Sequence, residues 1–385
     1  MQDTNIPKNK VIIIGGDHHN GLGLARILGM NGYDVYSVII SHHKKSWLQH
    51  SNYIKKTDVF PTYKDGLDFI QKEYKTVSNK IVLIPYSDGA ALELDNRLNQ
   101  LADCFVVPSI GNKTGQIATF MNKQKQYDFA TKHNLKMAKS FTLNLDEKIE
   151  TSIPFPCILK PIVSAEGDKR DIVVCKNDDE LKNAISTLKS KQYKRILLQE
   201  FIAYDYEIDA FGCICRKTPF FNIVPTKTIR AYPPKKGTNS FSEIITDEHI
   251  VDKCKQIVFA LQEIDFYGLY DIELFVRDDE IWLNEINFRN SGDVYMAINQ
   301  GFYYPLVWVN DALGYVNDSK LIHPSKKTFA MTELADIRNI FNGQVSLINW
   351  VKDFRKVNDF ALIFRGDMKP FFYKLFVGLK NIFIR

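Results

Sequence analysis

The residues best suited to chemistry lie in one acidic stretch, 270–292, with the sequence YDIELFVRDDEIWLNEINFRNSG. Its alternating apolar and polar residues predict two short strands, 271–276 and 281–287, joined by a charged turn at 277–280. A hairpin of this kind brings side chains of the two strands next to each other on each face. The polar residues of the stretch are therefore expected to act together.

Three of these side chains form a candidate metal site. Glu273 lies on the first predicted strand, and Glu285 and Asn287 share a face of the second. Two carboxylates and an amide oxygen are hard donors that suit Mg²⁺. Arg289 follows two residues later, where its guanidinium could hold a phosphate or carboxylate bidentately. The alternative is an amphipathic surface hairpin with a solvated acidic turn, and the stretch alone does not decide between the two.

The bulk composition is that of an ordinary globular protein. The chain has 385 residues, of which 45% are hydrophobic and 25% charged, which leaves room for two or three domains. A net charge of +5 is too small to indicate a nucleic-acid partner. The six cysteines show no metal-binding spacing, no signal-peptide core opens the chain, and no apolar run is long enough to span a membrane. These features predict a cytoplasmic protein and leave the oligomeric state open.

Residues 1–110 predict a separate α/β domain. Buried-strand runs, among them 10–16 and 80–85, alternate with helical patterns, which predicts an open parallel sheet with a ligand crevice at its strand ends. Asp88 follows one of these strands, so it either faces that crevice or caps the helix predicted at 90–101. The glycines after the first strand match a dinucleotide fingerprint poorly, and we do not predict an NAD site.

The middle of the chain, 111–315, carries a strand, loop, strand, helix, strand pattern. Lys160 and a proline end its first strand, and the loop 163–170 that follows contains Ser164 and Gly167. Backbone amides of such a loop could fold over phosphates, and Lys160 could neutralise their charge. A lone lysine in this position is more often a surface residue, so this pattern gains weight only from its neighbours.

Two basic segments lie outside this pattern. Residues 224–242 contain lysines, prolines and a glycine, which we interpret as a mobile lid over an anion rather than a solvated loop. Residues 316–385 predict an α-rich appendage. Its last part, 368–385, combines cations with aromatic and aliphatic residues at helical spacing, and contains no acid after Asp367. This tail suits either peripheral contact with an anionic inner membrane surface or docking in a protein groove.

The order of these pieces resembles that of the ATP-grasp superfamily over roughly residues 10–315. A lysine in a linker helix precedes KP after a strand, a glycine-containing loop, QEFI, a glutamate seven residues later, and finally E…EIN-x-R. The likeness is strongest to the carboxylate–amine ligase branch, including carbamoyl-phosphate-synthase-like and D-aspartate-ligase-like proteins. It implies a pre-ATP-grasp domain, then an ATP-grasp domain with a nucleotide-lid lobe at about 113–203 and a catalytic lobe at about 204–315.

The resemblance also implies roles for single residues. Metal ligands, usually of two Mg²⁺ ions that Mn²⁺ could replace, would be Glu273, Glu285 and Asn287. Arg289 would grip the acyl phosphate or the substrate carboxylate, and Lys160 would assist the transfer. The nucleotide would be bound by Lys123, Lys160, Ser164, Gly167, Glu200, the backbone at Phe201 and Ile202, and Glu207.

Two departures from the family pattern bear on the substrate. The branch that makes D-alanyl-D-alanine has an arginine two residues before the first metal ligand, where this chain has Asp271. Lys227 and Arg230 could replace that charge, and with Asp88 they complete the candidate substrate residues. The phosphate loop also has one glycine where many members have more.

The expected activity is an ATP- and Mg²⁺-dependent ligation. A carboxylate would be phosphorylated, and its acyl group would pass to an amine, on a small molecule or on a cell-envelope or surface-glycan precursor. The alternatives are a kinase or carboxylase-like enzyme that stops at a phosphorylated product, and a non-catalytic nucleotide-binding module.

Overall fold

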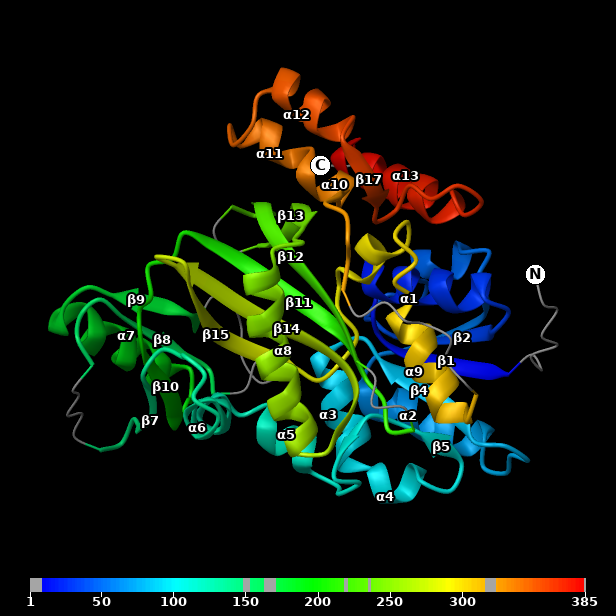
Figure 1. Ribbon diagram of the computed structural model, residues 1–385, viewed down its shortest axis with the longest axis horizontal. Coiled ribbons are helices and arrows are strands. Elements are labelled where there is room, and N and C mark those ends of the chain that lie inside the picture. Colours follow the sequence, from blue (N-terminus) through cyan, green and yellow to red (C-terminus); the bar gives the residue numbers. More distant parts are fainter. Residues whose placement is uncertain are drawn as a thin grey trace. The chain divides into compact units, whose positions relative to one another are not determined.

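The computed structural model describes residues 9–147, 153–162, 171–217, 221–234, 237–315 and 323–383 (Figure 1). The chain divides into two compact units. Unit 1 comprises residues 1–116, 209–271 and 288–385, and unit 2 comprises residues 117–208 and 272–287. Two of the predicted nucleotide-binding residues, Ser164 and Gly167, lie outside the described residues.

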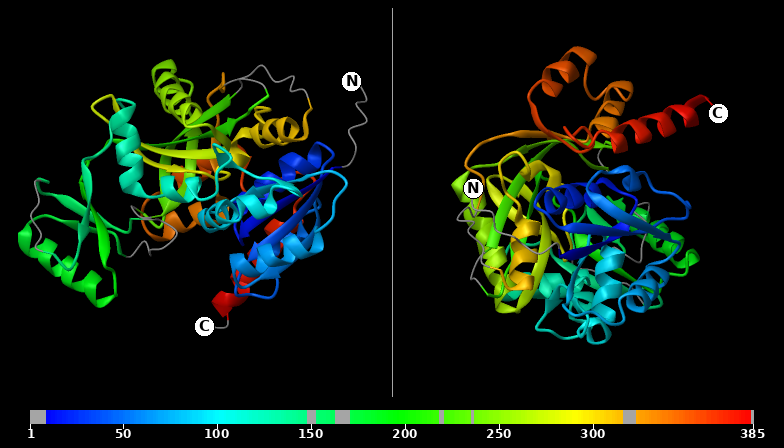
Figure 2. Two further views of the ribbon diagram at one scale, coloured as in Figure 1. Left: turned by 90° about the horizontal axis from the view of Figure 1, so that it is seen from below. Right: turned by 90° about the vertical axis from the view of Figure 1, so that its right-hand side faces the viewer.

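The N-terminal part of unit 1 is a five-stranded parallel sheet with the order β3-β2-β1-β4-β5. Strand β1 is buried on both faces, as its run of valine and isoleucine predicts. Helix α1 packs on the face that carries Val11 and Ile13, while α2 and α3 pack on the face of Ile12 and Ile14 (Figures 1 and 2). The predicted open parallel sheet is confirmed. Its elements are β1 (Lys10–Gly16), α1 (His19–Met30), β2 (Asp34–Ile40), β3 (Ile54–Phe60), α2 (Tyr63–Glu73), β4 (Ile81–Pro85), α3 (Asp88–Asn96), α4 (Leu98–Leu101) and β5 (Phe105–Val106).

The glycines at the end of β1 have a packing role. A Cβ atom on Gly15 would lie 2.4 Å from the ring of Tyr86, and one on Gly21 would lie 2.9 Å from it. Only glycine allows the Tyr86 ring to approach this closely. Close packing against Tyr86 therefore explains Gly15 and Gly21 without a dinucleotide.

The second sheet has eight strands in the order β15-β14-β11-β12-β13-β16-β17, with β6 paired to β14. The boundary between the units cuts β11 and β14, so residues 209–214 and 266–271 of these strands belong to unit 1. Its elements, with the helices of this region, are β6 (Ser109–Ile110), β11 (Tyr206–Ile214), β12 (Phe221–Tyr232), β13 (Thr238–Ile244), α8 (Glu248–Glu263), β14 (Phe266–Arg277), β15 (Glu280–Asn287), α9 (Tyr304–Leu313), β16 (Phe329–Met331) and β17 (Val357–Phe360).

The prediction of a mobile lid at 224–242 is wrong. These residues form most of β12 and β13, which pair in antiparallel register, with Thr226 opposite Ile244 and Lys227 opposite Glu243. The prolines and lysines resemble those of a loop, but the backbone has strand partners through most of the segment. A bulge around Arg230 accommodates the irregular stretch of the ladder.

Unit 2 contains a four-stranded sheet with the order β7-β10-β8-β9, in which every pairing is antiparallel. Helix α7 covers it through Leu181, Ile185 and Leu188, which pack against Leu159 and Leu198 of the strands. The predicted linker helix that contains Lys123 is preceded by a second short helix, and Asn122 caps the one that begins at Lys123. The elements are α5 (Gln116–Phe120), α6 (Lys123–Lys132), β7 (Ser140–Asn144), β8 (Cys157–Lys160), β9 (Val173–Cys175), α7 (Asp178–Ser190) and β10 (Arg195–Glu200).

The C-terminal segment of unit 1 is helical, as predicted, but it also supplies strands β16 and β17 to the sheet. The buried Arg26 of α1 anchors it, since its Nε lies 2.9 Å from Asp367 Oδ2 and its other nitrogens donate to backbone carbonyls of Ala361 and Leu362. Within the described residues, no helix has the length and hydropathy needed to cross a membrane. The helices are α10 (Glu333–Asp336), α11 (Arg338–Phe341), α12 (Leu347–Phe354) and α13 (Lys369–Phe383).

Candidate active site

The acidic stretch forms the predicted hairpin, with a shorter turn than expected. Arg277 ends β14 and Glu280 begins β15, so only Asp278 and Asp279 form the turn. Both have positive φ, 51° and 59°, the conformation that two-residue hairpin turns require and that aspartate tolerates. The tight turn fixes the register of the strands that carry the candidate metal ligands.

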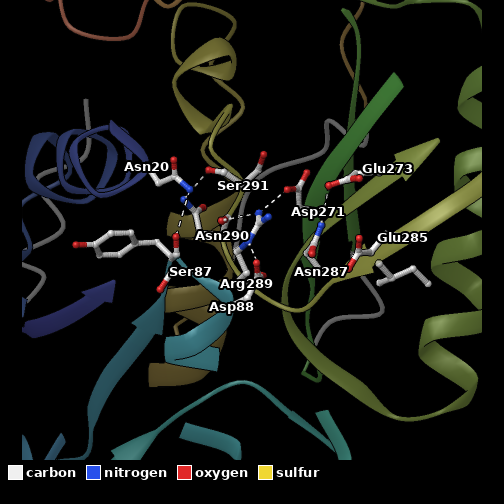
Figure 3. Close-up of polar contacts among 12 residues, drawn as sticks. Asn20, Ser87, Asp88, Asp271, Glu273, Glu285, Asn287, Arg289, Asn290 and Ser291 are labelled. Carbon is white, nitrogen blue, oxygen red and sulfur yellow. Dashed lines mark hydrogen bonds and ion pairs between the residues drawn. The ribbon is translucent and has the colours of Figure 1, made fainter. Parts of the chain in front are cut away.

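Two candidate metal ligands meet across this hairpin in unit 2. Glu273 Oε1 accepts a hydrogen bond from Asn287 Nδ2 at 3.3 Å (Figure 3). Glu273 Oε2 accepts one from Asn284 Nδ2 at 3.0 Å. The oxygen and nitrogen of a side-chain amide are assigned from its hydrogen bonds. A 180° rotation of the Asn287 amide places its oxygen where its nitrogen now lies. The pair can therefore present oxygens to a cation.

The third candidate ligand, Glu285, lies against a buried lysine pair. Lys123 Nζ is 2.7 Å from Glu285 Oε1, and both Lys123 and Lys160 are buried. Burial lowers the pKa of Lys160 to about 8, with a further lowering from the charge of Lys123, while Glu285 and Glu273 act in the opposite direction. Lys160 therefore lies within electrostatic range of both carboxylates, as a site for bridged phosphates requires.

A residue that the sequence did not single out positions Lys123. Gln126, one turn further along α6, is buried and bonds the backbone of Ile286 through both ends of its amide, at 2.8 Å each. The Lys123 amide also donates to the carbonyl of Ile162 at 3.1 Å. These bonds fix the start of α6 against β15. The sequence does not mark Gln126 as a positioning residue, because its role depends on the backbone of Ile286, 160 residues later in the chain.

The residues present fit a Mg²⁺ site. Glu273, Glu285 and Asn287 supply oxygen donors, the type that Mg²⁺ binds together with substrate phosphates. No group of three or more His, Cys, Asp or Glu side chains with metal-binding geometry occurs among the residues that the structure describes. The candidate set contains only two carboxylates, so it resembles a site completed by phosphate oxygens rather than a closed protein cage.

The candidate adenine and ribose residues lie in succession along unit 2. Glu200 ends β10, and the Phe201 amide donates to the carbonyl of Pro156 at 3.3 Å, so this N–H is engaged here. Ile202 is buried. Glu207 accepts a hydrogen bond from the Tyr204 hydroxyl. Their roles in binding adenosine stay predictions.

In unit 1, Arg289 is held between two carboxylates (Figure 3). Its Nε donates to Asp88 Oδ1 at 3.1 Å, and its Nη1 donates to Asp271. Asp88 is the first residue of α3 and Ser87 is the N-cap, so the alternative that Asp88 caps this helix is wrong. The Asn290 amide bonds the carbonyl of Pro85 at 3.0 Å, which seats Arg289 at the carboxyl end of β4.

A buried carboxylate beside this arginine was missed by the sequence analysis. Burial raises the pKa of Asp293 to about 7, a hydrogen bond from Asn239 lowers it, and the charge of Asp271 raises it further. Asn239 Nδ2 lies 2.9 Å from Asp293 Oδ2 and also donates to Asp209. Asp271 Oδ1 is buried and has no hydrogen-bond partner among the residues that the structure describes. No local pattern reveals this cluster, because its members come from four separate strands and loops.

Asp293 makes a testable contribution to the pH dependence of stability. Its pKa is about 7 when folded and 3.8 ordinarily, so the folded state binds the extra proton between these values and stability falls as pH rises through them. Asp293→Asn should remove this slope and, at pH 8, gain on the order of 2–3 kcal/mol relative to the parent. Urea denaturation at pH 4.5 and pH 8 measures it.

The control is Asp278→Asn in the exposed hairpin turn, which should keep the parental slope. Asp359, whose pKa burial also raises to about 7, leaves part of the slope in every variant. Equal pH dependence in Asp293→Asn and the parent would show that Asp293 stays ionised in the folded chain.

The remaining candidate substrate residues lie on β12. Arg230 contacts Asp336 at 2.8 Å and Asp353 at 2.7 Å, so its guanidinium joins β12 to α10 and α12. Lys227 is partly buried opposite Glu243 in the ladder. Their substrate role stays a prediction, and the ion pairs give Arg230 a structural role as well.

Comparison with known protein families identifies one domain of the chain. Residues 128–300 match the model of the ATP-grasp domain. The chain contains an ATP-grasp domain. The matched region includes Lys160, Glu273, Glu285 and Asn287, so the predicted order of motifs and the predicted fold class are confirmed.

The similar proteins are ligases of the carboxylate–amine group. Formate-dependent phosphoribosylglycinamide formyltransferase of Prochlorococcus marinus (strain CCMP1986 / NIES-2087 / MED4) is 28% identical over 58% of this chain and 56% of its own length. D-alanine–D-alanine ligase of Geobacillus thermodenitrificans is 24% identical over 61% and 66%. N5-carboxyaminoimidazole synthetase from Staphylococcus aureus shares the fold, with a TM-score of 0.65, 14% identity and coverage of 87% and 86%. The chain spans 56% and 66% of the lengths of these two curated relatives, so an activity shared with them is a matter for proposal.

Proposed function

We propose that the chain is an ATP- and Mg²⁺-dependent ligase that phosphorylates a carboxylate and transfers the acyl group to an amine. One observation supports this most: the buried pair Lys123 and Lys160 adjoins Glu285 and Glu273, with Asn287 bonded to Glu273. The lysines suit the negative charge of a triphosphate, and the carboxylates suit the metal ion that the triphosphate carries. A cluster of only acidic or only basic side chains would bind the metal or the triphosphate, but not the two together.

The chemistry requires phosphorylation because a free carboxylate has no adequate leaving group. ATP transfers its γ-phosphoryl group to a carboxylate oxygen, which releases ADP and gives an acyl phosphate. The amine nitrogen then attacks the acyl carbon, the C–O bond to phosphate breaks, and the amine loses a proton. Lys123 and Lys160 would stabilise the charge on the transferring group. Mg²⁺ held by Glu273, Glu285 and Asn287 would supply further charge neutralisation.

Arg289 is the proposed partner of the carboxylate or its acyl phosphate. Asp88 and Asp271 hold its guanidinium at a strand end of the parallel sheet, so the arginine is oriented before substrate arrives. Glu200, Phe201, Ile202 and Glu207 would bind adenosine. The substrate roles of Lys227 and Arg230 are retained as proposals.

Trapping distinguishes this proposal from the kinase alternative. When a panel of carboxylic acids is tested one by one, we expect one acid to stimulate the release of ADP. Hydroxylamine should then convert the acyl phosphate of that acid into a hydroxamate. A product stable to hydroxylamine would favour a kinase. Nucleotide binding without turnover across the panel would favour a non-catalytic module.

The proposal extends to an acceptor on a cell-envelope or surface-glycan precursor, with the tail at a membrane surface. The tail helix α13 is partly docked, since Tyr373 stacks near His50 and Lys374 lies over the ring of Trp47. Phe372 and Phe376 remain exposed. Phe372→Ser/Phe376→Ser should therefore reduce sedimentation of the protein with phosphatidylglycerol vesicles. These substitutions leave the docked residues Tyr373 and Lys374 of α13 unchanged.

A further inference from the structure

Short helices α11 and α12 carry an exposed apolar patch, defined here as Phe341, Leu347, Ile348 and Val351. Their exposed fractions are 83%, 61%, 71% and 37%, and three of them are among the four most exposed large apolar side chains in the part of the chain that the structure describes. Single exposed apolar residues are common on soluble proteins, but a contiguous group is a mark of an interaction site.

Other side chains of α12 attach it firmly to unit 1. Trp350 Nε1 donates to Asp336 Oδ2 at 3.0 Å, and Asp353 is 2.7 Å from Arg230. The Phe354 ring lies between those of Trp350 and Phe360, with centroids 5.1 and 4.8 Å away. Because these contacts fix the rotation of the helix about its axis, the apolar patch faces outward through the fold itself.

The charges around the patch are almost all positive. Residues 337–356 contain four cations and one acid, and that acid, Asp353, is paired both with Arg230 and, at 3.4 Å, with Lys356. Lys352, Arg355 and Lys356 are exposed at the end of α12. Figure 1 draws α10, α11 and α12 near one another in orange, and the last three of these cations lie on or directly after α12, the helix that carries Leu347, Ile348 and Val351.

This combination selects among the possible partners. A second copy joined through the same patch would bring two cationic rims together, which opposes a symmetric dimer. Apolar side chains bordered by lysine and arginine are instead typical of a helix that lies in the interface of an anionic bilayer. We propose that the patch on α11 and α12 binds an anionic lipid surface. The inference is independent of the ligase activity.

Vesicle sedimentation tests it on the full-length chain. Phosphatidylcholine vesicles with phosphatidylglycerol should sediment the parent, whereas phosphatidylcholine alone should not. Leu347→Ser/Ile348→Ser should weaken the bound fraction by about tenfold or more. Lys352→Glu/Lys356→Glu should weaken it most at low ionic strength, where surface charge counts most. The matched control is Phe259→Ser, which removes an exposed phenylalanine from α8.

Each result decides the proposal. Equal sedimentation of Leu347→Ser/Ile348→Ser and the parent would overturn it, as would loss of binding only in Phe372→Ser/Phe376→Ser, which would assign the contact to α13. A dimer seen by light scattering, abolished by the Leu347/Ile348 variant and without vesicle binding, would assign the patch to a second copy. The melting temperature of every variant shows that a loss of binding is not a loss of fold.

Discussion

Glu285→Gln is expected to lower the rate of ATP turnover at saturating Mg²⁺ by about 100-fold or more. The side chain has two proposed tasks, to bind the metal and to balance the charge of Lys123, whose Nζ is 2.7 Å away. Glutamine keeps the size and a hydrogen-bond acceptor but removes the negative charge. The half-saturating Mg²⁺ concentration should therefore rise together with the loss of rate, which a coupled assay of ADP release measures.

A matched control separates the site from the hairpin. Glu280 lies on the same strand and forms an exposed ion pair with Lys136, so Glu280→Gln should change turnover by less than about twofold. Glu285→Gln leaves a buried lysine without its full countercharge and should also cost about 1–3 kcal/mol of unfolding free energy. Parental turnover and Mg²⁺ dependence in a folded Glu285→Gln protein would remove Glu285 from the site.

Lys160→Met is expected to impair catalysis strongly while stabilising the fold. Loss of the ammonium should lower kcat/KM for ATP by about 100-fold or more, because Lys123 would be the one lysine of the pair left to neutralise the phosphates. The lowered pKa, about 8 against an ordinary 10.5, means that burial disfavours the charged lysine. At pH 7 the methionine variant should gain on the order of 2–3 kcal/mol in unfolding free energy.

The sign of this effect can be checked against pH. Between pH 8 and 10.5 the unfolded chain holds the Lys160 proton and the folded chain does not, so parental stability rises with pH in this window. The advantage of Lys160→Met should accordingly shrink as pH approaches 10.5. Lys132→Met, at an exposed position of α6, should alter neither turnover nor stability. A Lys160→Met protein less stable than the parent at every pH would contradict the assigned burial cost.

The hairpin was predictable because its information is local. Alternation of apolar and polar residues fixes the faces of β14 and β15, and two aspartates suit the turn, so only the turn length differs from expectation. The strand that ends in Lys160 was predictable for the same reason. Its closeness to Glu273 and Glu285 was inferred from the family resemblance, since no spacing in the chain implies it.

What could not be predicted depends on distant partners. Asp293 is a plain polar residue in sequence, and its raised pKa arises from burial and from residues on other segments. The segment 224–242 looked like a loop because prolines and lysines are rare within strands, yet its partners on both sides make it part of a sheet. Ser87, rather than Asp88, caps α3, a shift of one residue that propensity alone does not resolve.

The most direct measurement is a crystal structure with Mn²⁺ and a non-hydrolysable ATP analogue, with the metal located by its anomalous scattering. The account predicts Mn²⁺ at about 2.1–2.2 Å from oxygens of Glu273, Glu285 and Asn287, with Lys160 Nζ on the phosphates. A metal ligated elsewhere, or phosphates remote from Lys160, would contradict it.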